Sequence, residues 1–345
     1  MGTLKDIAEE VGISPASVSL YLNNKNTNRV GEKTKKKIDI AVKKHNYSIN
    51  IFARSLATSK SKLVGILIPT SQPFFLNEYT NELLSGIQSK LAEYGYGIVF
   101  LPASKTSSIE IIEEQLKRSV GCDGYIVFST GFCSKEQMEK NIKNVNNLNL
   151  PYVTLNIPKL DTNINQILIP AIHYPKGIEY LVSKGHKNII TLLGRKNGYN
   201  SQILYENTVN LYKKLNLSEN IDKIYFGDYE ALKSTKVALK ALELNNNATA
   251  ICCMSDVMAI GAINACNMLS LKVPDDISII GRNNSEVAKL SYPRISTVDL
   301  MMRQSGRAAA SLLHESINGE EAIQQIFINE EIIERDSIKD LNNEN

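Results

Sequence analysis

The side chains best suited to covalent chemistry are few in this chain, and their spacing does not fit a catalytic site. The sequence has no G-x-S-x-G motif for a nucleophilic serine and no H-E-x-x-H motif for zinc. Residues 194–198 resemble a phosphate-binding loop but lack the G-K-[ST] ending, which supplies the lysine and the metal-binding hydroxyl. The four histidines are scattered along the chain: His45, His173, His186 and His314. We therefore predict that the chain is not an enzyme, has no catalytic residues and needs no cofactor.

The cysteines do not form a metal site either. No C-x-x-C pair is present, and no cysteine is spaced from a histidine as in zinc sites. All five lie within or beside apolar runs: Cys122, Cys133, Cys252, Cys253 and Cys266. We predict that they are reduced core thiols of a cytosolic protein and that no metal is bound.

The basic side chains are concentrated in the first part of the sequence. Residues 1–62 carry 12 Lys and Arg against 5 Asp and Glu, a net charge of +7, whereas the remaining residues have a net charge of −4. A basic head on a mildly acidic body indicates a module for nucleic acid or another anionic surface joined to a second module. The length of 345 residues predicts two or three domains, and the 43% hydrophobic content excludes general disorder.

The apolar runs are too short for a membrane protein. Runs such as 63–69 and 98–103 are far below the roughly 18 residues that a spanning helix needs. The first residues have no apolar signal core. We expect a cytoplasmic protein without a membrane partner.

Three short helices are expected to position the basic residues of the head. Thr3 and Asp6 have the spacing of a capping box before a helix that Gly12 ends. Ser14 is a suitable N-cap for a second helix, and a third is expected at about residues 32–44. Two short helices joined by a tight turn containing glycine, with a third helix closing a small core, are typical of a helix-turn-helix unit.

From residue 62 onward, strand-like apolar runs alternate with helical patterns, as in a parallel α/β sheet with crossover helices. Roughly 280 residues exceed one comfortable core, so we expect two α/β lobes. The polar residues after Arg335 are expected to be a frayed tail. The predicted strands are 63–69, 97–103, 124–129, 151–156, 166–171, 188–194, 222–226, 249–254 and 277–281.

Several motifs, in matching order, resemble the lactose-repressor/galactose-repressor (LacI/GalR) family of bacterial transcriptional regulators. The head carries TLKDIAEEVGISPASVSLYLN at residues 3–23, and the body carries SDVMAIG at 255–261 and VPDDISIIG at 273–281. Further matches lie at 30–33, 46–47, 50–57 and 185–187, so that the resemblance covers residues 3 to about 337. It implies a helix-turn-helix domain (1–48), a hinge helix and linker (49–61), a two-lobed core similar to periplasmic binding proteins (62–338) and a polar tail (339–345). It also implies that the lobes exchange strands near residues 293–322.

The resemblance gives the second helix of the head the role of reading DNA in the major groove. Pro15, Ala16 and Leu20 take the positions that meet base edges, and Ser17, Ser19 and Asn23 can reach phosphates or bases. Most relatives carry Arg or another hydrogen-bonding residue where this chain has Leu20, and Leu offers only apolar contact, for example to a thymine methyl. We hypothesise an operator half-site that departs from the usual family operator; the alternative is that Leu20 is a core residue.

The remaining DNA contacts implied by the family lie in the linker and at the rim of the head. Leu56 takes the place of the leucine that wedges a central base step from the minor groove, a contact that requires two copies of the chain and therefore a homodimer on a pseudo-palindromic operator. Lysines of the head would add attraction to the phosphates that is not sequence-specific. The other candidates are Arg29, Tyr47, Asn50, Ala53 and Arg54.

The family's small-molecule effector binds in a cleft between the two lobes, and here this sequence departs from the usual pattern. Relatives commonly have Arg where this chain has Tyr205, and Asp where it has Asn283. Losing this charged pair weakens the grip on sugar hydroxyls. Aromatic residues in the cleft can stack on a ligand or belong to the core. The candidate effector-binding residues are Phe74, Phe75, Phe128, Asn156, Ser201, Tyr205, Tyr229, Ser255, Asp256 and Asn283.

Three interpretations of these departures stay open: a more planar effector held by stacking, an anionic effector held by Arg195, Lys196 or Arg282, or a silent cleft. The effector class is accordingly a sugar, a nucleobase or a phosphorylated metabolite. The last residues contain no leucine heptads, which favours a dimer over a tetramer. The alternative function is a cytosolic solute-binding or carbohydrate-processing α/β protein with a vestigial DNA-binding head.

Overall fold

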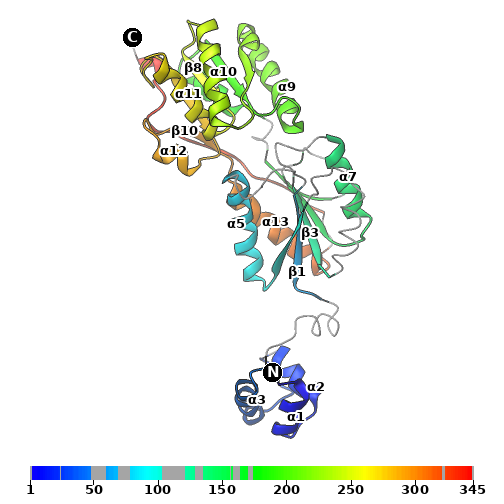
Figure 1. Cartoon of the computed structure of the whole chain (residues 1–345). Coiled ribbons are helices and arrows are strands. Elements are labelled where there is room, and N and C mark those ends of the chain that lie inside the picture. Colours follow the sequence, from blue (N-terminus) through cyan, green and yellow to red (C-terminus); the bar gives the residue numbers. More distant parts are fainter. Residues whose placement is uncertain are drawn as a thin grey trace. The chain divides into compact units, whose positions relative to one another are not determined.

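The computed structural model (Figure 1) describes residues 2–23, 25–47, 60–68, 78–102, 121–128, 135–155, 157, 164–169, 174–320 and 323–343. The chain divides into two compact units, Met1–Ser61 and Lys62–Asn345. The first is helical in its described part, and the second contains two sheets.

The first unit contains α1 (Leu4–Val11), α2 (Pro15–Asn23) and α3 (Glu32–Lys44). The predicted capping box is present, because the Thr3 hydroxyl accepts a hydrogen bond from the Asp6 amide and the Asp6 carboxylate accepts one from the Thr3 amide. Gly12 ends α1 with φ of 76°, a left-handed conformation that glycine adopts easily. Ser14 caps α2 by accepting a hydrogen bond of 3.2 Å from the Ser17 amide. The helix-turn-helix prediction is therefore confirmed, caps included.

Apolar side chains from all three helices meet in the core of this unit. Tyr21 on α2 is buried, and its hydroxyl donates to the Asp39 carboxylate on α3 at 2.7 Å. The Lys25 ammonium pairs with the same carboxylate and lies over the Tyr21 ring. This arrangement joins the end of α2 to α3 and fixes the orientation of α2. The buried core residues are Ile7, Ala8, Val18, Tyr21, Val30, Ile38 and Ala41.

The second unit has two six-stranded sheets, one for each lobe. The first sheet has the strand order β11-β5-β4-β3-β1-β2, all parallel. Helices α5 (Glu78–Glu93) and α13 (Met302–Ile317) pack on one face, and α7 (Lys135–Asn146) packs on the other. The strands are β1 (Leu63–Ile68), β2 (Gly97–Pro102), β3 (Gly124–Phe128), β4 (Tyr152–Leu155), β5 (Asn165–Leu168) and β11 (Gln325–Phe327).

The second sheet has the order β12-β10-β9-β8-β6-β7, in which only β12 is antiparallel to its neighbour. Its strands are β6 (Ile189–Leu193), β7 (Ile224–Phe226), β8 (Ala250–Cys253), β9 (Ser278–Arg282), β10 (Ser296–Asp299) and β12 (Glu331–Ile333). The helices of this lobe are α8 (Lys176–Ser183), α9 (Tyr199–Lys214), α10 (Ala231–Leu244), α11 (Asp256–Met268) and α12 (Glu286–Leu290), with short 3-10 helices η3 (Ser218–Lys223) and η4 (Leu341–Asn343).

The chain passes between the lobes late in the sequence, as the family resemblance implied. After β10 of the second sheet, α13 returns to the first lobe and is followed by β11 of the first sheet; β12 then joins the second sheet. The two lobes are therefore joined by several segments, and a change in their relative orientation has to bend all of these segments together.

The prediction of a frayed tail after Arg335 is wrong for the described residues up to 343. The Ser337 hydroxyl donates to the Ile279 carbonyl on β9 and accepts from the Ser296 amide on β10, so it bridges two neighbouring strands of the second sheet. His186 contacts the Lys339 carbonyl at 3.1 Å, and the Leu341 amide donates to the Lys184 carbonyl at 2.9 Å. Hydrogen bonds to the backbone hold this segment in place, although its polar composition is typical of a disordered terminus.

Burial of the thiols agrees with the prediction of core cysteines. Cys122, Cys252, Cys253 and Cys266 are buried and form no disulfide, and Cys133 lies outside the described residues. Burial raises the pKa of Cys122 to about 11 and that of Cys252 to about 12, which keeps both thiols protonated and unreactive.

Candidate DNA-binding surface and effector cleft

One side of α2 is turned to the core of the head, and the other is accessible to a partner. Val18 and Tyr21 are buried, whereas Pro15, Ala16 and Asn23 are exposed. Leu20 is half-buried and is not among the apolar side chains that form the core of this unit. Its position disfavours the interpretation of Leu20 as a core residue and leaves it on the surface that the family uses to read DNA.

Hydrogen bonds within α2 hold its polar side chains in place. The Ser17 hydroxyl lies 2.9 Å from that of Ser14, and the Asn23 amide donates to the Ser19 hydroxyl at 3.2 Å. Such bonds lower the entropy lost when these side chains meet DNA. Tyr47 is half-buried and packs against the head core, which gives it a structural role as well.

Cationic side chains line the surface of α3 and the loop before it. Arg29 is exposed, and so are five lysines of α3, namely Lys33, Lys36, Lys37, Lys43 and Lys44. Lys44 is bound to Glu10 at 3.0 Å, and this carboxylate also contacts His45 at 2.6 Å. These pairs join α3 to α1 and leave the other lysines to attract phosphates. The predicted hinge contacts Asn50, Ala53, Arg54 and Leu56 lie outside the described residues.

The predicted effector residues separate into three groups. Phe74, Phe75 and Asn156 lie outside the described residues, as does the side chain of Phe128. Ser201, Tyr205 and Tyr229 lie close together at one end of the second sheet. Ser255, Asp256 and Asn283 are engaged in contacts within the second lobe.

Tyr229 follows β7 and lies over the start of the loop at residues 194–198. A β-carbon added at Gly194 would lie 1.9 Å from the Tyr229 ring, so a larger residue there would displace the ring. The Tyr229 hydroxyl lies 3.3 Å from that of Ser201 on α9, and Tyr205 on the same helix stacks on Phe226 with ring centroids 6.3 Å apart. The glycine of the apparent phosphate loop thus has a packing role, and the structure supplies an aromatic surface beside α9.

Asp256 is a buried carboxylate that joins three segments of the second lobe. One oxygen accepts hydrogen bonds of 2.8 Å from both the amide and the hydroxyl of Ser285, and the other accepts one of 2.7 Å from the Thr297 hydroxyl. Burial raises the pKa of this carboxyl to about 6, although the hydrogen bonds oppose the shift. Both oxygens of the Asp256 carboxylate, which was predicted to bind the effector, therefore already accept hydrogen bonds from the protein.

The neighbours of Asp256 also have structural roles. Ser255 caps α11, because its hydroxyl accepts a hydrogen bond from the Met258 amide at 3.2 Å. Asn283 has φ of 104°, and its amide donates to the Val298 carbonyl at 2.8 Å, which continues the pairing of β9 with β10. Their role in effector binding stays a prediction.

A small pocket opens at the same end of the second sheet. Arg282, the last residue of β9, is 6% exposed, and its Nη1 donates only to the Met254 sulfur at 3.4 Å. Its Nη2 is buried without a hydrogen-bond partner. The sequence analysis named Arg282 only as one of three residues that could bind an anionic effector. The sequence feature that could have singled it out is a cationic residue at the end of an apolar strand. The pocket lining includes Tyr174, Lys176, Cys252, Met254, Gly281 and Arg282.

The described part of the chain contains neither a metal-binding cluster nor a membrane-spanning helix. No group of three or more His, Cys, Asp or Glu side chains is arranged to hold a metal ion. None of the described helices combines the length and apolar character needed to cross a bilayer.

Comparisons with known proteins agree with this architecture. Residues 3–50 match the model for bacterial regulatory proteins of the lacI family, and residues 178–338 match the periplasmic binding protein-like domain. The HTH-type transcriptional repressor PurR of Actinobacillus pleuropneumoniae serotype 3 is 30% identical over 350 aligned residues, covering 99% of this chain and 100% of that protein.

Solved structures show the same fold over the whole chain. The lac repressor dimer bound to operator and the anti-inducer ONPF has a TM-score of 0.84 at 22% identity, covering 98% of this chain and 99% of the other. A LacI family regulator from Enterococcus faecium with bound ribose has a TM-score of 0.65 at 19% identity, covering 81% of this chain and 99% of the other. The head, the two-lobed body and the full-length match to PurR together show that the chain belongs to the LacI family of bacterial regulatory proteins.

Proposed function

We propose that the protein is a cytoplasmic transcriptional repressor that binds a pseudo-palindromic operator as a homodimer and responds to a small molecule bound between its lobes. The observation that carries this proposal is the helix-turn-helix head with an accessible α2 surface, joined to a two-lobed body in a chain similar over its full length to a PurR repressor. The relatives are named as repressors, which supports the prediction that the chain is not an enzyme.

DNA binding divides between two sets of side chains. Exposed lysines of α3 attract phosphates and supply affinity that falls as salt rises. Base edges are read by residues along α2, where Leu20 contributes an apolar contact rather than hydrogen bonds. The dimer is supported by the lac repressor structure, in which a dimer is bound to operator.

Control by an effector requires that the ligand bind one arrangement of the lobes more tightly than another. The several segments that pass between the lobes provide a mechanical link for such a change. A relative with bound ribose supports a small-molecule site in this fold, and the aromatic surface of Tyr205 and Tyr229 fits a ligand held by stacking.

Selection of binding sites from random double-stranded DNA by the full chain tests the proposal. We expect a two-fold symmetric site whose half-sites are richer in A·T pairs than the usual family operator, because Leu20 favours a thymine methyl over guanine. Leu20→Arg should introduce a guanine at one position of each half-site, worth about 1–3 kcal/mol of discrimination.

Lys33→Ala is the matched control, since Lys33 is exposed on α3. It should weaken binding to all sequences alike and lower the salt dependence by about one phosphate contact. If the chain enriches no sequence at all, the solute-binding alternative is favoured. If wild-type protein selects the usual family operator, the role given to Leu20 is wrong although the repressor function stands.

A further inference from the structure

Arg282 is a buried cation whose guanidinium forms no direct ion pair with a carboxylate of the described residues, although Glu330 lies near enough to attract it through space. It ends β9, which lies between β8 and β10 inside the second sheet. A guanidinium has five N–H donors and stays charged at neutral pH. Of these donors, those of Nη1 reach only the Met254 sulfur, a weak acceptor, and those of Nη2 reach no acceptor.

The carboxylates of the surrounding segments are already engaged with other groups. Asp256 accepts hydrogen bonds from Ser285 and Thr297, and Glu330 pairs with Lys176 at 3.2 Å. Burial lowers the pKa of the Arg282 guanidinium from its usual value, which reflects the unfavourable environment of the charge. A charge in such a place is normally neutralised by a partner that forms hydrogen bonds with it.

The pocket in front of Arg282 has the chemistry expected of an anion site. Its described lining contains Lys176 and Arg282 and no carboxylate; because Lys176 is paired with Glu330, Arg282 is the cation that a ligand would meet there. Gly177 and Gly281 bring the backbone close to the pocket, and Met254 and Cys252 supply an apolar wall that strengthens a charged hydrogen bond. The residue next to Arg282 is the neutral Asn283, so it brings no negative charge to the guanidinium.

We propose that this pocket binds an oxyanion, the carboxylate or phosphate group of a small molecule, through the Arg282 guanidinium. A planar guanidinium pairs with such a group through two parallel N–H···O bonds. This proposal identifies the effector as an anion. It rests on the proposed function only for the regulatory role of the site, not for the binding of the anion. Sugars without a charged group and neutral bases are then poor effectors.

Thermal unfolding of the full chain tests the site directly. Inorganic phosphate and succinate are the two probes, added at constant ionic strength with chloride as the reference anion. At least one probe should raise the Tm of the wild-type protein in a saturable manner, and the effective probe shows whether phosphate or carboxylate is preferred. Arg282→Met should reduce that shift at least fivefold and leave the ligand-free Tm equal or higher, since an unpaired charge is replaced by an apolar chain.

Two further variants make the result specific. Lys196→Met removes an exposed cation of the same lobe and should keep the wild-type response. Arg282→Gln keeps the polarity without the charge, and it replaces the Met variant if that protein does not fold. Equal responses in wild-type and Arg282 variants, or no saturable response of the wild-type protein to either probe, would overturn the proposal.

Operator binding of the same proteins separates this site from the proposed function. One outcome is that the Arg282 variants lose the thermal response to the anions, while the operator affinity of the wild-type protein does not change when the anions are added. The anion site is then supported, and its regulatory role is not. If the wild-type protein binds no specific operator, the repressor function fails, and the thermal result still decides the anion site.

Discussion

Asp256 illustrates how a residue that a motif assigns to a ligand can serve the fold. The family resemblance made it a candidate effector-binding residue of the cleft. In the structure its carboxylate joins the start of α11 to Ser285 and to Thr297 on β10. Gly281 is required beside it, because an added β-carbon would lie 2.1 Å from the Asp256 oxygen. Contacts between residues this far apart in the sequence cannot be predicted from a motif, because a motif describes only the spacing of neighbouring residues.

The raised pKa of Asp256 predicts a pH dependence of stability. Its carboxyl titrates near 3.8 when unfolded and at about 6 in the folded protein, so the folded state binds this proton more tightly. The stabilisation is present below pH 3.8 and is lost as pH rises through 6, by an amount of about 3 kcal/mol for a shift of this size. Urea unfolding between pH 4 and 7 should therefore show a fall in the free energy of unfolding of wild-type protein that Asp256→Asn lacks.

The control for this experiment is Asp275→Asn, at an exposed position of the same lobe. Its stability curve should run parallel to that of the wild-type protein. Parallel curves for Asp256→Asn as well would show that the Asp256 carboxyl is not the group responsible.

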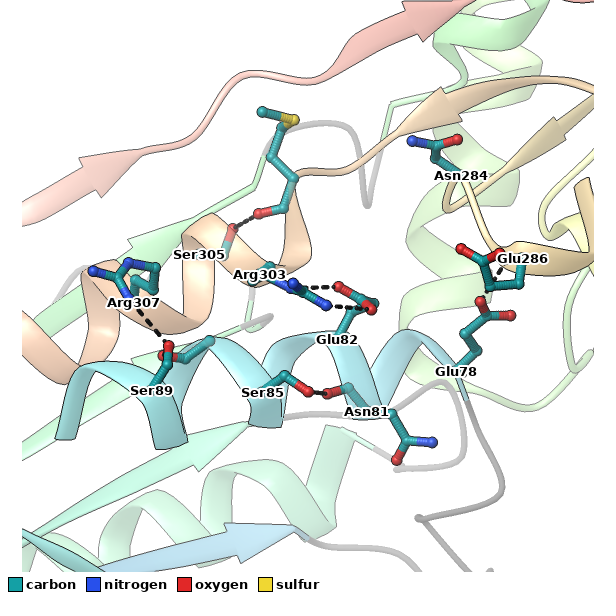
Figure 2. Close-up of polar contacts among 12 residues, drawn as sticks. Glu78, Asn81, Glu82, Ser85, Ser89, Asn284, Glu286, Arg303, Ser305 and Arg307 are labelled. Carbon is teal, nitrogen blue, oxygen red and sulfur yellow. Dashed lines mark hydrogen bonds and ion pairs between the residues drawn. The ribbon is translucent and has the colours of Figure 1, made fainter. Parts of the chain in front are cut away.

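At the scale of elements, the closest helix contact in the first lobe is that of α5 with α13, more than two hundred residues apart in the sequence. An added β-carbon at Gly86 would lie 2.1 Å from the Arg303 carbonyl, and one at Gly306 would lie 2.2 Å from the Leu83 carbonyl. Figure 2 shows the ion pairs beside this contact, where Arg303 binds both oxygens of Glu82 at 2.9 and 3.0 Å. The glycines bring the two helix backbones together, and the exposed ion pairs add at most about 1 kcal/mol each.

Replacing Gly306 by Ala should therefore destabilise the protein although alanine is the better helix former. The methyl group has to push two backbones apart, which typically costs about 1–3 kcal/mol beyond the gain of about 1 kcal/mol in helix propensity. The free energy of chemical unfolding measures the effect. Ser85→Ala, at an exposed position of α5, is the control and should change stability by less than about 0.5 kcal/mol. A Gly306→Ala protein as stable as wild type would contradict the close backbone contact.

The elements themselves were largely predictable from local pattern. All nine predicted strands are present, because each is a short apolar run between turns, and the helix caps at Thr3 and Ser14 follow from their own side chains. Strands β10, β11 and β12 were not predicted, since each has only three or four residues and no clear alternation of buried and exposed positions. The exchange between lobes near residues 293–322 was implied by the family resemblance alone, and the pairing of these three strands was not predicted. The residues of the candidate site were harder to predict from the sequence, because the roles of Tyr229 and Arg282 depend on which segments meet at the end of the second sheet.

At the scale of the whole molecule, the lobes contact one another through polar groups near the passages between them. Glu78, at the start of α5 in the first lobe, accepts a hydrogen bond of 2.6 Å from the Glu286 amide in the second (Figure 2). Within the second lobe, Asn284 donates to Asp299 at 2.8 Å close to the point where the chain returns to α13. Polar contacts of this kind can be exchanged for water at low cost, so they suit a pair of lobes that shift when an effector binds.

A pseudo-palindromic operator needs two copies of the chain, and the second lobe carries an apolar surface suited to a second copy. Leu290 and Tyr292, at and just after the end of α12, are 80% and 96% exposed, and Val287 is exposed beside them. Large apolar side chains grouped in this way mark interaction surfaces, and aromatic anchors contribute most of the binding energy. We predict that Tyr292→Asp weakens dimerisation by at least about 2 kcal/mol, or more than tenfold in the dissociation constant.

Sedimentation over a range of protein concentrations measures this change, with Leu232→Asp as the control. Leu232 is 79% exposed on α10 of the same lobe, so it tests whether a charge at any exposed apolar residue has the same effect. The Tyr292 variant should also lose affinity for the full palindrome while its affinity for a single half-site is unchanged, because each head still folds and reads its own base pairs. A Tyr292→Asp protein that stays dimeric, with a Leu232→Asp protein that dissociates, would place the dimer interface on α10 instead.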